Sequence, residues 1–598
     1  MKNWTAIVIL GFLTACGGGG GSGGSSSTPL SGSVSQGFPI SGATVTLIDA
    51  MGNEQIAGVT DIDGNYTVPD ISNLTAPIVV KASGTAGGYP VTLYGLLSNK
   101  GSSNVANVTP LTDAVLTQAI GSSPTLLLNE PGRVATINTT TVTAVANRFT
   151  SALSDVLDQI TPDASKTFNP LSTPFVANGS HAADKVNDLI KVASVSTANG
   201  VETDLIDKSN TVGIVTVTTQ GAVDKLRSVP SSVASVSISR LKKTVDMLTA
   251  AFASESTIES AALENLFTSD FLDDGLNKAE QIREFRSFKN LLAGTVVSNP
   301  KINMCKTGEL CSLRLTLKGP VLNQAMDVWA KYDPVKDHFL LYGNQYKFKA
   351  QIDSHIHRSI NLSNNNVTTQ AALSVVINNQ DAFWNTYETA KAEFVSPDGS
   401  VDLTNLYRLK PNDCYPNKPG SFYYDGMPRD DNTSNCWHGQ MFDTNNEQQL
   451  KDINAKIKRG GYKVVVKAWK NSNRSGEPDL VEIPLVEPLA TTDRIAESGY
   501  PMVTRQSSAS GELPYLQIDN ADDFVVTGSL CLSKNTVCNV NDVEQGSTTT
   551  QPNGQPKLAR KIQAVKSDGW SNGDPIRAFF VHVMDKAGRD LILSAYSN

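Results

Sequence analysis

The sequence is poor in charge and has no concentrated basic segment. Lys, Arg, Asp and Glu make up 18% of the 598 residues, and the formal net charge at pH 7 is −8. Surfaces that bind nucleic acids cluster Lys and Arg against the phosphates, and no such cluster occurs in this chain. We therefore expect no nucleic acid among its partners.

Long apolar runs and catalytic signatures are also missing. After the first 15 residues, no stretch has the roughly 20 consecutive apolar residues that a membrane-spanning helix needs. The chain has no HExxH and no CxxC motif. These absences weaken the hypothesis of an enzyme without excluding it, because a pair of catalytic carboxylates has no fixed motif.

The first residues have the pattern of an export signal. Lys2 precedes the short apolar run 6–12, and small residues then lead to Cys16. A charged start, a short apolar run and small residues before a cleavage site are typical of a secretory signal peptide. The segment Leu13-Thr14-Ala15-Cys16 resembles the lipobox of bacterial lipoproteins. The resemblance implies removal of residues 1–15 and acylation of Cys16, for example with palmitate; the alternative is an ordinary signal peptide with a chance cysteine.

Residues 16–30 are expected to be a lipidated tether. Residues 17–28 read GGGGGSGGSSST, a composition that gives a flexible chain. Gly17 stands where lipoproteins retained in the inner membrane usually carry Asp, so the resemblance implies the outer membrane of a Gram-negative cell. The lipid bilayer is then a partner through Cys16, and the sequence leaves open whether the chain faces the periplasm or the cell surface.

The remaining cysteines favour an oxidising compartment. Six cysteines permit 15 pairings, so the sequence does not fix the connectivity, and pairing of neighbours is the simplest expectation. A zinc site is the alternative, although only His438 lies near a cysteine. The expected neighbouring pairs are Cys305/Cys311, Cys414/Cys436 and Cys531/Cys538.

Length and patterning predict a multidomain, β-rich chain with an α+β middle. Short alternating strands begin the folded part, and two segments there, 40–45 (ISGATV) and 60–66 (TDIDGNY), resemble the carboxypeptidase regulatory-like module. The resemblance implies a transthyretin-like β-sandwich over 31–104, an accessory domain without peptidase residues, with Tyr66 packed inward. We interpret Asp61-Ile62-Asp63-Gly64 as a turn rather than half a calcium loop, because the later ligands are missing.

The middle of the chain combines helices and strands. Thr109-Pro110 is a typical helix start, and apolar residues at helical spacing predict a helix over 142–160, so 105–230 is expected to be mainly helical. Helices and then a strand meander, with a strand run over 339–357, are expected in 237–360. This order is similar to NTF2-like cone folds, which implies a pocket and makes a small-molecule carrier one hypothesis. Residues 365–598 are expected to form one or two β-sandwich domains.

Asp353, His355 and His357 are the candidate metal ligands. Residues two apart on a strand face the same side, so both imidazoles and the carboxylate point the same way. The alternative is two solvent-facing histidines on a strand. Because the residues nearby offer no clear third ligand with an open coordination position, we expect no cofactor.

Exposed aromatics suggest a recognition surface. Tyr423, Tyr424 and Trp437 lie in or beside the Cys414–Cys436 segment and are candidates for contact with a protein or glycan; packing onto the sandwich is the alternative. The favoured hypothesis is a non-catalytic outer-membrane lipoprotein that displays β-rich modules for binding or for envelope or surface assembly. An envelope hydrolase acting on cell-wall or polymer substrates and the small-molecule carrier are the alternatives.

Overall fold

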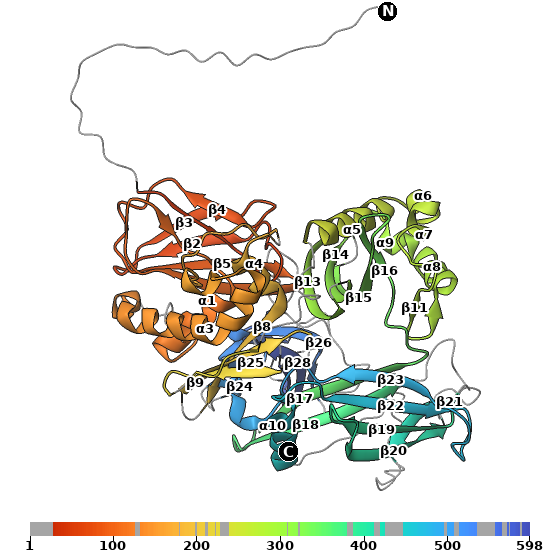
Figure 1. Cartoon of the computed structure of the whole chain (residues 1–598). Coiled ribbons are helices and arrows are strands. Elements are labelled where there is room, and N and C mark those ends of the chain that lie inside the picture. The colour runs from red at the N-terminus through yellow and green to blue at the C-terminus, as the bar shows by residue number, and fades with distance from the viewer. Residues whose placement is uncertain are drawn as a thin grey trace, which may run out of the picture.

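The computed structural model is multidomain and β-rich (Figure 1). Among the described residues, no helix is long and apolar enough to cross a membrane. The described residues are 28–125, 132–178, 180–197, 200–209, 213–221, 223–227, 238–307, 309–320, 323–378, 387–411, 419–424, 447–495, 499–506, 513–534, 557–564, 571–572, 574–585 and 589–597.

The N-terminal unit is a β-sandwich of two sheets. The sheet orders are β4-β1-β7 and β3-β2-β5-β6, and a separate hydrophobic cluster fills the space between them. Tyr66 is part of that cluster, and its hydroxyl donates to the carbonyl of Ala106 at 2.5 Å. The strands are β1 Leu30–Ser33, β2 Thr44–Ile48, β3 Glu54–Val59, β4 Asn65–Val68, β5 Ile78–Ala86, β6 Tyr89–Leu97 and β7 Asn104–Val105.

The segment 61–64 is a turn held by one carboxylate. Asp61 accepts hydrogen bonds from the backbone N–H groups of Asp63 at 3.0 Å and Asn65 at 2.7 Å. Gly64 has a φ of 75°, and its N–H donates to the carbonyl of Asp61. Because the carboxylate is engaged by the local backbone, the interpretation as a turn is confirmed.

The second unit contains more strand than expected. Thr109 caps α1 as its position predicts, because its hydroxyl accepts from the N–H of Thr112 at 3.2 Å. A three-stranded sheet of order β10-β9-β8 follows the helices, although 105–230 was expected to be mainly helical. The principal elements are α1 Pro110–Ile120, α3 Thr139–Ile160, α4 Ala182–Leu189, β8 Ile190–Thr197, β9 Gly200–Asp207 and β10 Ile214–Val217.

The third unit packs helices against a sheet of order β13-β14-β15-β16. The expected strand run 339–357 is wrong as one element: β16 ends this sheet, and β17 (Lys349–Asn361) belongs to the next one. The other elements are α5 Ile238–Ala251, α6 Glu255–Ile258, α7 Ala261–Glu264, β11 Leu272–Asp273, β12 Leu276–Asn277, α8 Lys278–Ser287, α9 Lys289–Leu292, β13 Val296–Thr307, β14 Leu310–Lys318, β15 Asn323–Asp333 and β16 His338–Leu341.

Three sheets make up the C-terminal region. Their orders are β18-β17-β29-β28-β26, β21-β20-β19-β22-β23 and β24-β25-β27. The elements are β18 Val367–Asn378, β19 Thr389–Val395, β20 Val401–Pro411, β21 Pro419–Tyr424, α10 Glu447–Ile457, β22 Lys463–Trp469, β23 Asp479–Pro484, η4 Thr492–Arg494, β24 Met502–Gln506, β25 Tyr515–Asp519, β26 Phe524–Ser533, β27 Lys561–Gln563, β28 Ala578–Asp585 and β29 Asp590–Tyr596.

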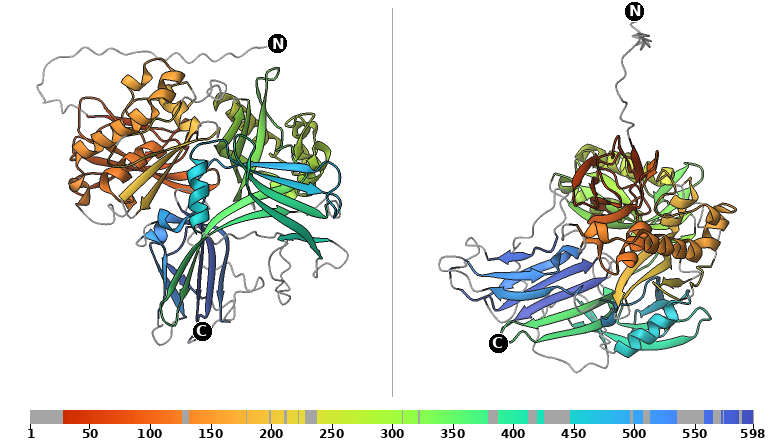
Figure 2. Two further views of the ribbon diagram at one scale, coloured as in Figure 1. Left: turned by 60° about the horizontal axis from the view of Figure 1, so that its bottom comes forward. Right: turned by 90° about the vertical axis from the view of Figure 1, so that its left-hand side faces the viewer.

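Hydrophobic cores cross the boundaries between these units. One cluster runs from Phe38 in the sandwich through the α3 helix to Leu341 in β16. A second joins Ile206 on β9 to Val375 on β18 and to α10. Figure 2 shows the corresponding close packing of the units in two further views. Since burying apolar surface is the main favourable term in folding, the units stabilise one another.

Candidate functional site

The candidate metal ligands lie on the middle of a sheet. Strand β17 pairs with β18 on one side and, in parallel, with β29 on the other. Ile356 and Ile360 point into the hydrophobic cluster on one face of this sheet. Strand alternation therefore places Asp353, His355 and His357 together on the opposite face, as the spacing predicts.

The two imidazoles have different partners and different exposure. His355 is 5% exposed, and its Nδ1 lies 3.2 Å from a carboxylate oxygen of Asp353. His357 is exposed, and its Nε2 lies 3.0 Å from the hydroxyl oxygen of Ser594 on β29. The histidines are thus part of two separate side-chain contacts.

The neighbouring strands add two titratable groups. Asp590 is opposite His355 in the parallel register, and His582 on β28 is opposite Ile592, the residue beside His357. Burial raises the pKa of the Asp590 carboxyl to about 6, and the charge of Asp353 adds to this effect. Burial also lowers the pKa of His582. Sequence analysis missed both residues, because they are more than 200 positions from β17 and no local pattern reveals a parallel pairing.

These side chains do not assemble a metal site. In the part of the chain that the structure describes, no group of three or more His, Cys, Asp or Glu could hold a metal ion. Residues two apart on a strand are separated by roughly 6.5 Å along the backbone, so their tips must converge to share one ion. The two imidazoles contact different groups, His355 the carboxylate of Asp353 and His357 the hydroxyl of Ser594.

Arg314 brings the third unit to the same place. Its guanidinium donates to both carboxylate oxygens of Asp327 at 2.9 and 2.6 Å, and it lies 5.2 Å from the ring centre of Tyr89 at the start of β6. A Cβ atom on Gly87 would be 3.1 Å from Arg314 Cγ, so the β5–β6 hairpin tip rests directly on this side chain. Arg314 is also close enough to Asp590 to lower the pKa of that carboxyl. Three units therefore meet here, and we call this region the central junction.

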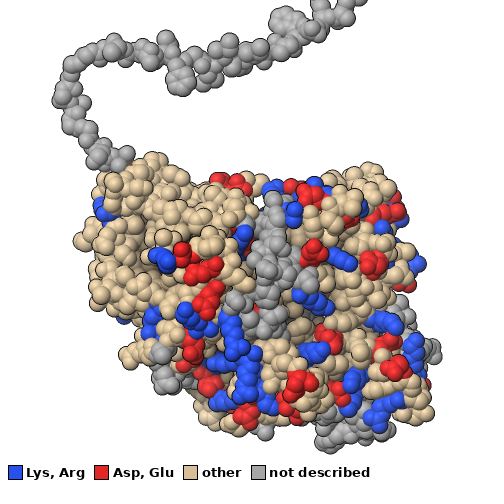
Figure 3. All heavy atoms as spheres, viewed as in Figure 1, with Lys and Arg blue, Asp and Glu red and all other residues tan. Residues whose placement is uncertain are grey.

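A second charged contact joins the second unit to the C-terminal region. Arg494 in η4 forms an ion pair with Asp204 on β9, whose side chain is fully buried. Arg589 donates to the carbonyl of Arg494 at 2.5 Å and to the carboxylate of Asp585 at 2.7 Å. On the face in Figure 3, Lys and Arg side chains gather in a band over β8 and β24. Charges from several elements are thus combined where the units touch.

A buried acid and a buried lysine lie beside α4. Neither carboxylate oxygen of Asp188 has a hydrogen-bond partner, and burial and the nearby Asp184 raise its pKa. Lys208 donates to the carbonyl of Asn187 at 3.1 Å, and burial lowers its pKa to about 8. Burial likewise lowers the pKa of Lys301 on β13 to about 7. No motif in the sequence indicates this cluster.

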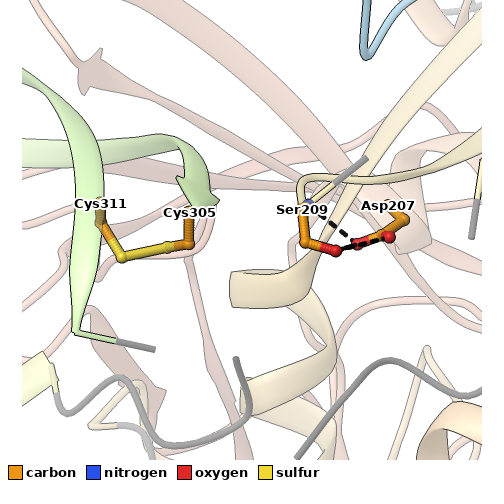
Figure 4. The surroundings of a disulfide bond; sticks show 4 residues. All are labelled: Asp207, Ser209, Cys305 and Cys311. Carbon is orange, nitrogen blue, oxygen red and sulfur yellow. Dashed lines mark hydrogen bonds between the residues drawn. A yellow bond between two sulfur atoms is a disulfide. The ribbon is translucent and has the colours of Figure 1, made fainter. Parts of the chain in front are cut away.

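One predicted disulfide is present between neighbouring strands. Cys305 and Cys311 are a register pair of β13 and β14, with a Cα–Cα distance of 4.0 Å, and both are buried (Figure 4). In the same view, Ser209 donates to the carboxylate of Asp207 just after β9. Cys531 is disulfide-bonded on β26.

The remaining predicted site residues are only partly described. Tyr423 and Tyr424 lie on β21 and pair with Arg408 and Tyr407 of β20 in the ladder. The residues that lie outside the described part of the chain are Cys16, Cys414, Cys436, Trp437 and Cys538.

The described interior of the third unit is filled by side chains. Phe252 and Phe285 meet edge to face at 5.7 Å, and Phe267 packs against Phe271 at 4.9 Å. A shallow groove borders this core, and Phe267 lines it together with Asp270, Lys278 and the β15–β16 turn. The hypothesis of a carrier with a pocket between helices and sheet stays a prediction.

Comparisons with known proteins add no assignment. No protein-family model, no curated protein and no solved structure matches this chain.

Proposed function

We propose that this chain is an exported, lipid-anchored protein that presents fused β-rich units at the outer membrane for binding or envelope assembly, without catalysis. The observation that carries the proposal is that charged side chains make contacts across the unit boundaries. Arg494 of the C-terminal region pairs with Asp204 of the second unit, and the β5–β6 hairpin tip of the sandwich rests on Arg314 of the third unit. Such contacts hold domains in a fixed arrangement, which suits a protein that displays a surface.

Two features support export and anchoring. The segment Leu13–Cys16 has the lipobox pattern, and residues 17–28 form a Gly/Ser-rich tether. The Cys305–Cys311 disulfide fits an oxidising compartment, because reducing systems keep such pairs open in the cytosol.

Two measurements test this proposal, membrane fractionation and protease accessibility on intact cells, each comparing the native chain with Cys16→Ala. In the fractionation, we expect the native chain to stay with membranes and Cys16→Ala to be released into the soluble fraction. Digestion in whole cells would direct a partner search to surface molecules, and protection until the outer membrane is opened would direct it to the cell wall and envelope proteins. Soluble native chain would contradict the anchor.

One contact favours a hydrolase as the second candidate. Ser594 Oγ lies 3.0 Å from His357 Nε2, the geometry of a nucleophile beside a base. The carboxylate of Asp353, on the same strand as His357, contacts His355. Incubation of the full chain with peptidoglycan and ester substrates tests this candidate. Turnover that Ser594→Ala removes, and that Ser359→Ala on the neighbouring strand leaves intact, would establish the hydrolase and overturn the non-catalytic proposal.

A further inference from the structure

The strongly exposed apolar side chains concentrate in one short segment. Of the five large apolar side chains that are more than 60% exposed among the described residues, four lie within residues 51–62. They are Met51 at 70%, Ile56 at 75%, Val59 at 65% and Ile62 at 63%, and we call them the β3 strip. Single exposed apolar residues are ordinary, whereas these four lie within 12 residues of sequence and concentrate apolar surface on β3 and the turns at its two ends.

The strip follows an open sheet edge. Strand β3 is the outer strand of the β3-β2-β5-β6 sheet, and β2 is its sole ladder partner within the described residues. Edge strands are usually protected by Lys, by Pro or by a covering element. The β3 sequence EQIAGV has neither Lys nor Pro, and it lies on the side of the molecule away from the C-terminal sheets (Figure 1). Its ladder with β2 has a register shift between Val45 and Thr46, and its exposed apolar side chains remain open to contact with a membrane.

The tether joins the fold beside this edge. The N–H of Thr28 donates to a carboxylate oxygen of Asp70 at 2.9 Å. Asp70 lines a shallow surface groove together with Glu54 and Gln55, the first two residues of β3. Thr28 follows Cys16 by 12 residues in the sequence, so the chain between them can span at most about 40 Å. An acylated Cys16 would therefore keep the bilayer surface within reach of the β3 strip.

We infer that the β3 strip lies on the bilayer, with its four side chains inserted at the boundary between head groups and acyl chains. This inference rests on the proposed lipid anchor at Cys16. Exposed apolar residues on a peripheral protein enter this boundary by about 5–10 Å, where the backbone groups of an edge strand still reach water and head groups. The contact fixes the orientation of the sandwich, and with it the fused units, relative to the membrane.

The charge around the strip specifies the lipid class. Glu54, Asp61 and Asp63 flank the apolar side chains, and the only cations in residues 29–104 are Lys81 and Lys100. Anionic head groups would be repelled, so we expect contact with zwitterionic lipids such as phosphatidylethanolamine. Because the attraction is apolar, raised salt leaves it unchanged, unlike attraction between opposite charges.

Site-specific photocrosslinking tests the contact. A benzophenone amino acid replaces Ile56 in the full lipidated chain, in vesicles of phosphatidylethanolamine and phosphatidylcholine and in cells. The matched control replaces Val335, which is 92% exposed and lies in the β15–β16 turn of the third unit. The expected result is at least fivefold more lipid adduct at position 56, although exposure alone would favour position 335. Equal lipid adducts, or a protein adduct from a partner or second copy at position 56, would overturn the inference.

A separate readout distinguishes this inference from the anchor on which it rests. Mass spectrometry of the N-terminal peptide of the native chain measures acylation of Cys16 by itself, and thermal melting confirms that both labelled chains are folded. If Cys16 carries no acyl chain, the proposed anchor is wrong. If Cys16 is acylated while the native chain gives no lipid adduct at position 56, the anchor stands and the β3 contact is wrong.

Discussion

Arg494 pairs with the buried carboxylate of Asp204 across a separation of 290 residues. Asp204 also accepts a hydrogen bond from Thr216 at 2.6 Å, so its carboxylate has partners on both sides. The pair joins β9 of the second unit to the segment that leads into the C-terminal sheets. Its position explains why the second unit and the C-terminal region share a hydrophobic core.

Removal of Asp204 should destabilise the protein strongly. Asp204→Ala leaves the Arg494 guanidinium, 14% exposed, without its counter-charge, and breaking a buried pair typically costs about 3–5 kcal/mol. Denaturant unfolding measures the loss. The control is Asp522→Ala, which removes the exposed Arg560–Asp522 pair and should cost about 1 kcal/mol or less. Equal losses in the two variants would show that burial of the Asp204 pair has no energetic consequence.

The β5–β6 hairpin tip should tolerate no added methyl group at Gly88. Its φ is 84°, and a Cβ atom there would lie 2.7 Å from the Cβ of Ala325 on β15. We expect Gly88→Ala to lower the free energy of unfolding by about 1–2 kcal/mol because alanine disfavours a left-handed conformation, and by a further 1–3 kcal/mol because the added methyl group overpacks the contact. Gly121→Ala is the matched control, because its φ is 74° and nothing lies within 4 Å of the added Cβ. A free energy of unfolding equal to that of Gly121→Ala would argue against tight docking of the hairpin.

Asp590 should make the protein less stable as the pH rises from about 4 to 6. Burial raises the pKa of this carboxyl from 3.8 to about 6 in the folded state, so the folded chain holds the proton where the unfolded chain has released it. The stabilisation is complete below pH 4 and is lost as the pH rises through 6. In Asp590→Asn this part of the pH dependence should disappear, which denaturation midpoints at pH 4, 5, 6 and 7 would reveal. Parallel profiles for the two proteins would contradict the assignment.

Loss of the Cys305–Cys311 disulfide should have a modest effect. The bond closes a short loop, with a sequence separation of 6, and loop-closure entropy gives about 2 kcal/mol for a ring of this size. The double variant Cys305→Ala/Cys311→Ala should lower the free energy of unfolding by that amount, and mass spectrometry of the native chain should find the cross-linked peptide. A free thiol at Cys305 in the exported protein would contradict the pairing.

Local features were accessible from sequence alone. The apolar residues at helical spacing in 142–160 lie within α3, and Thr109 caps α1. Each depends on interactions within a few helical turns, where residue type and spacing determine the outcome. The same reasoning placed Asp353, His355 and His357 on one face, because alternation along a strand is a local property.

The tertiary structure decided how these elements combine. The parallel pairing of β17 with β29 brings Asp590 beside His355, and it divides the expected strand run 339–357 between two sheets. Side-chain alternation shows which residues of a strand share a face, but not which distant strand becomes its neighbour. That choice depends on the joint burial of surfaces from segments far apart in the chain. The sequence by itself therefore determined local elements such as α3 and the shared face of β17, and long-range packing determined the central junction, the Asp204–Arg494 pair and the place of the β3 strip beside the tether.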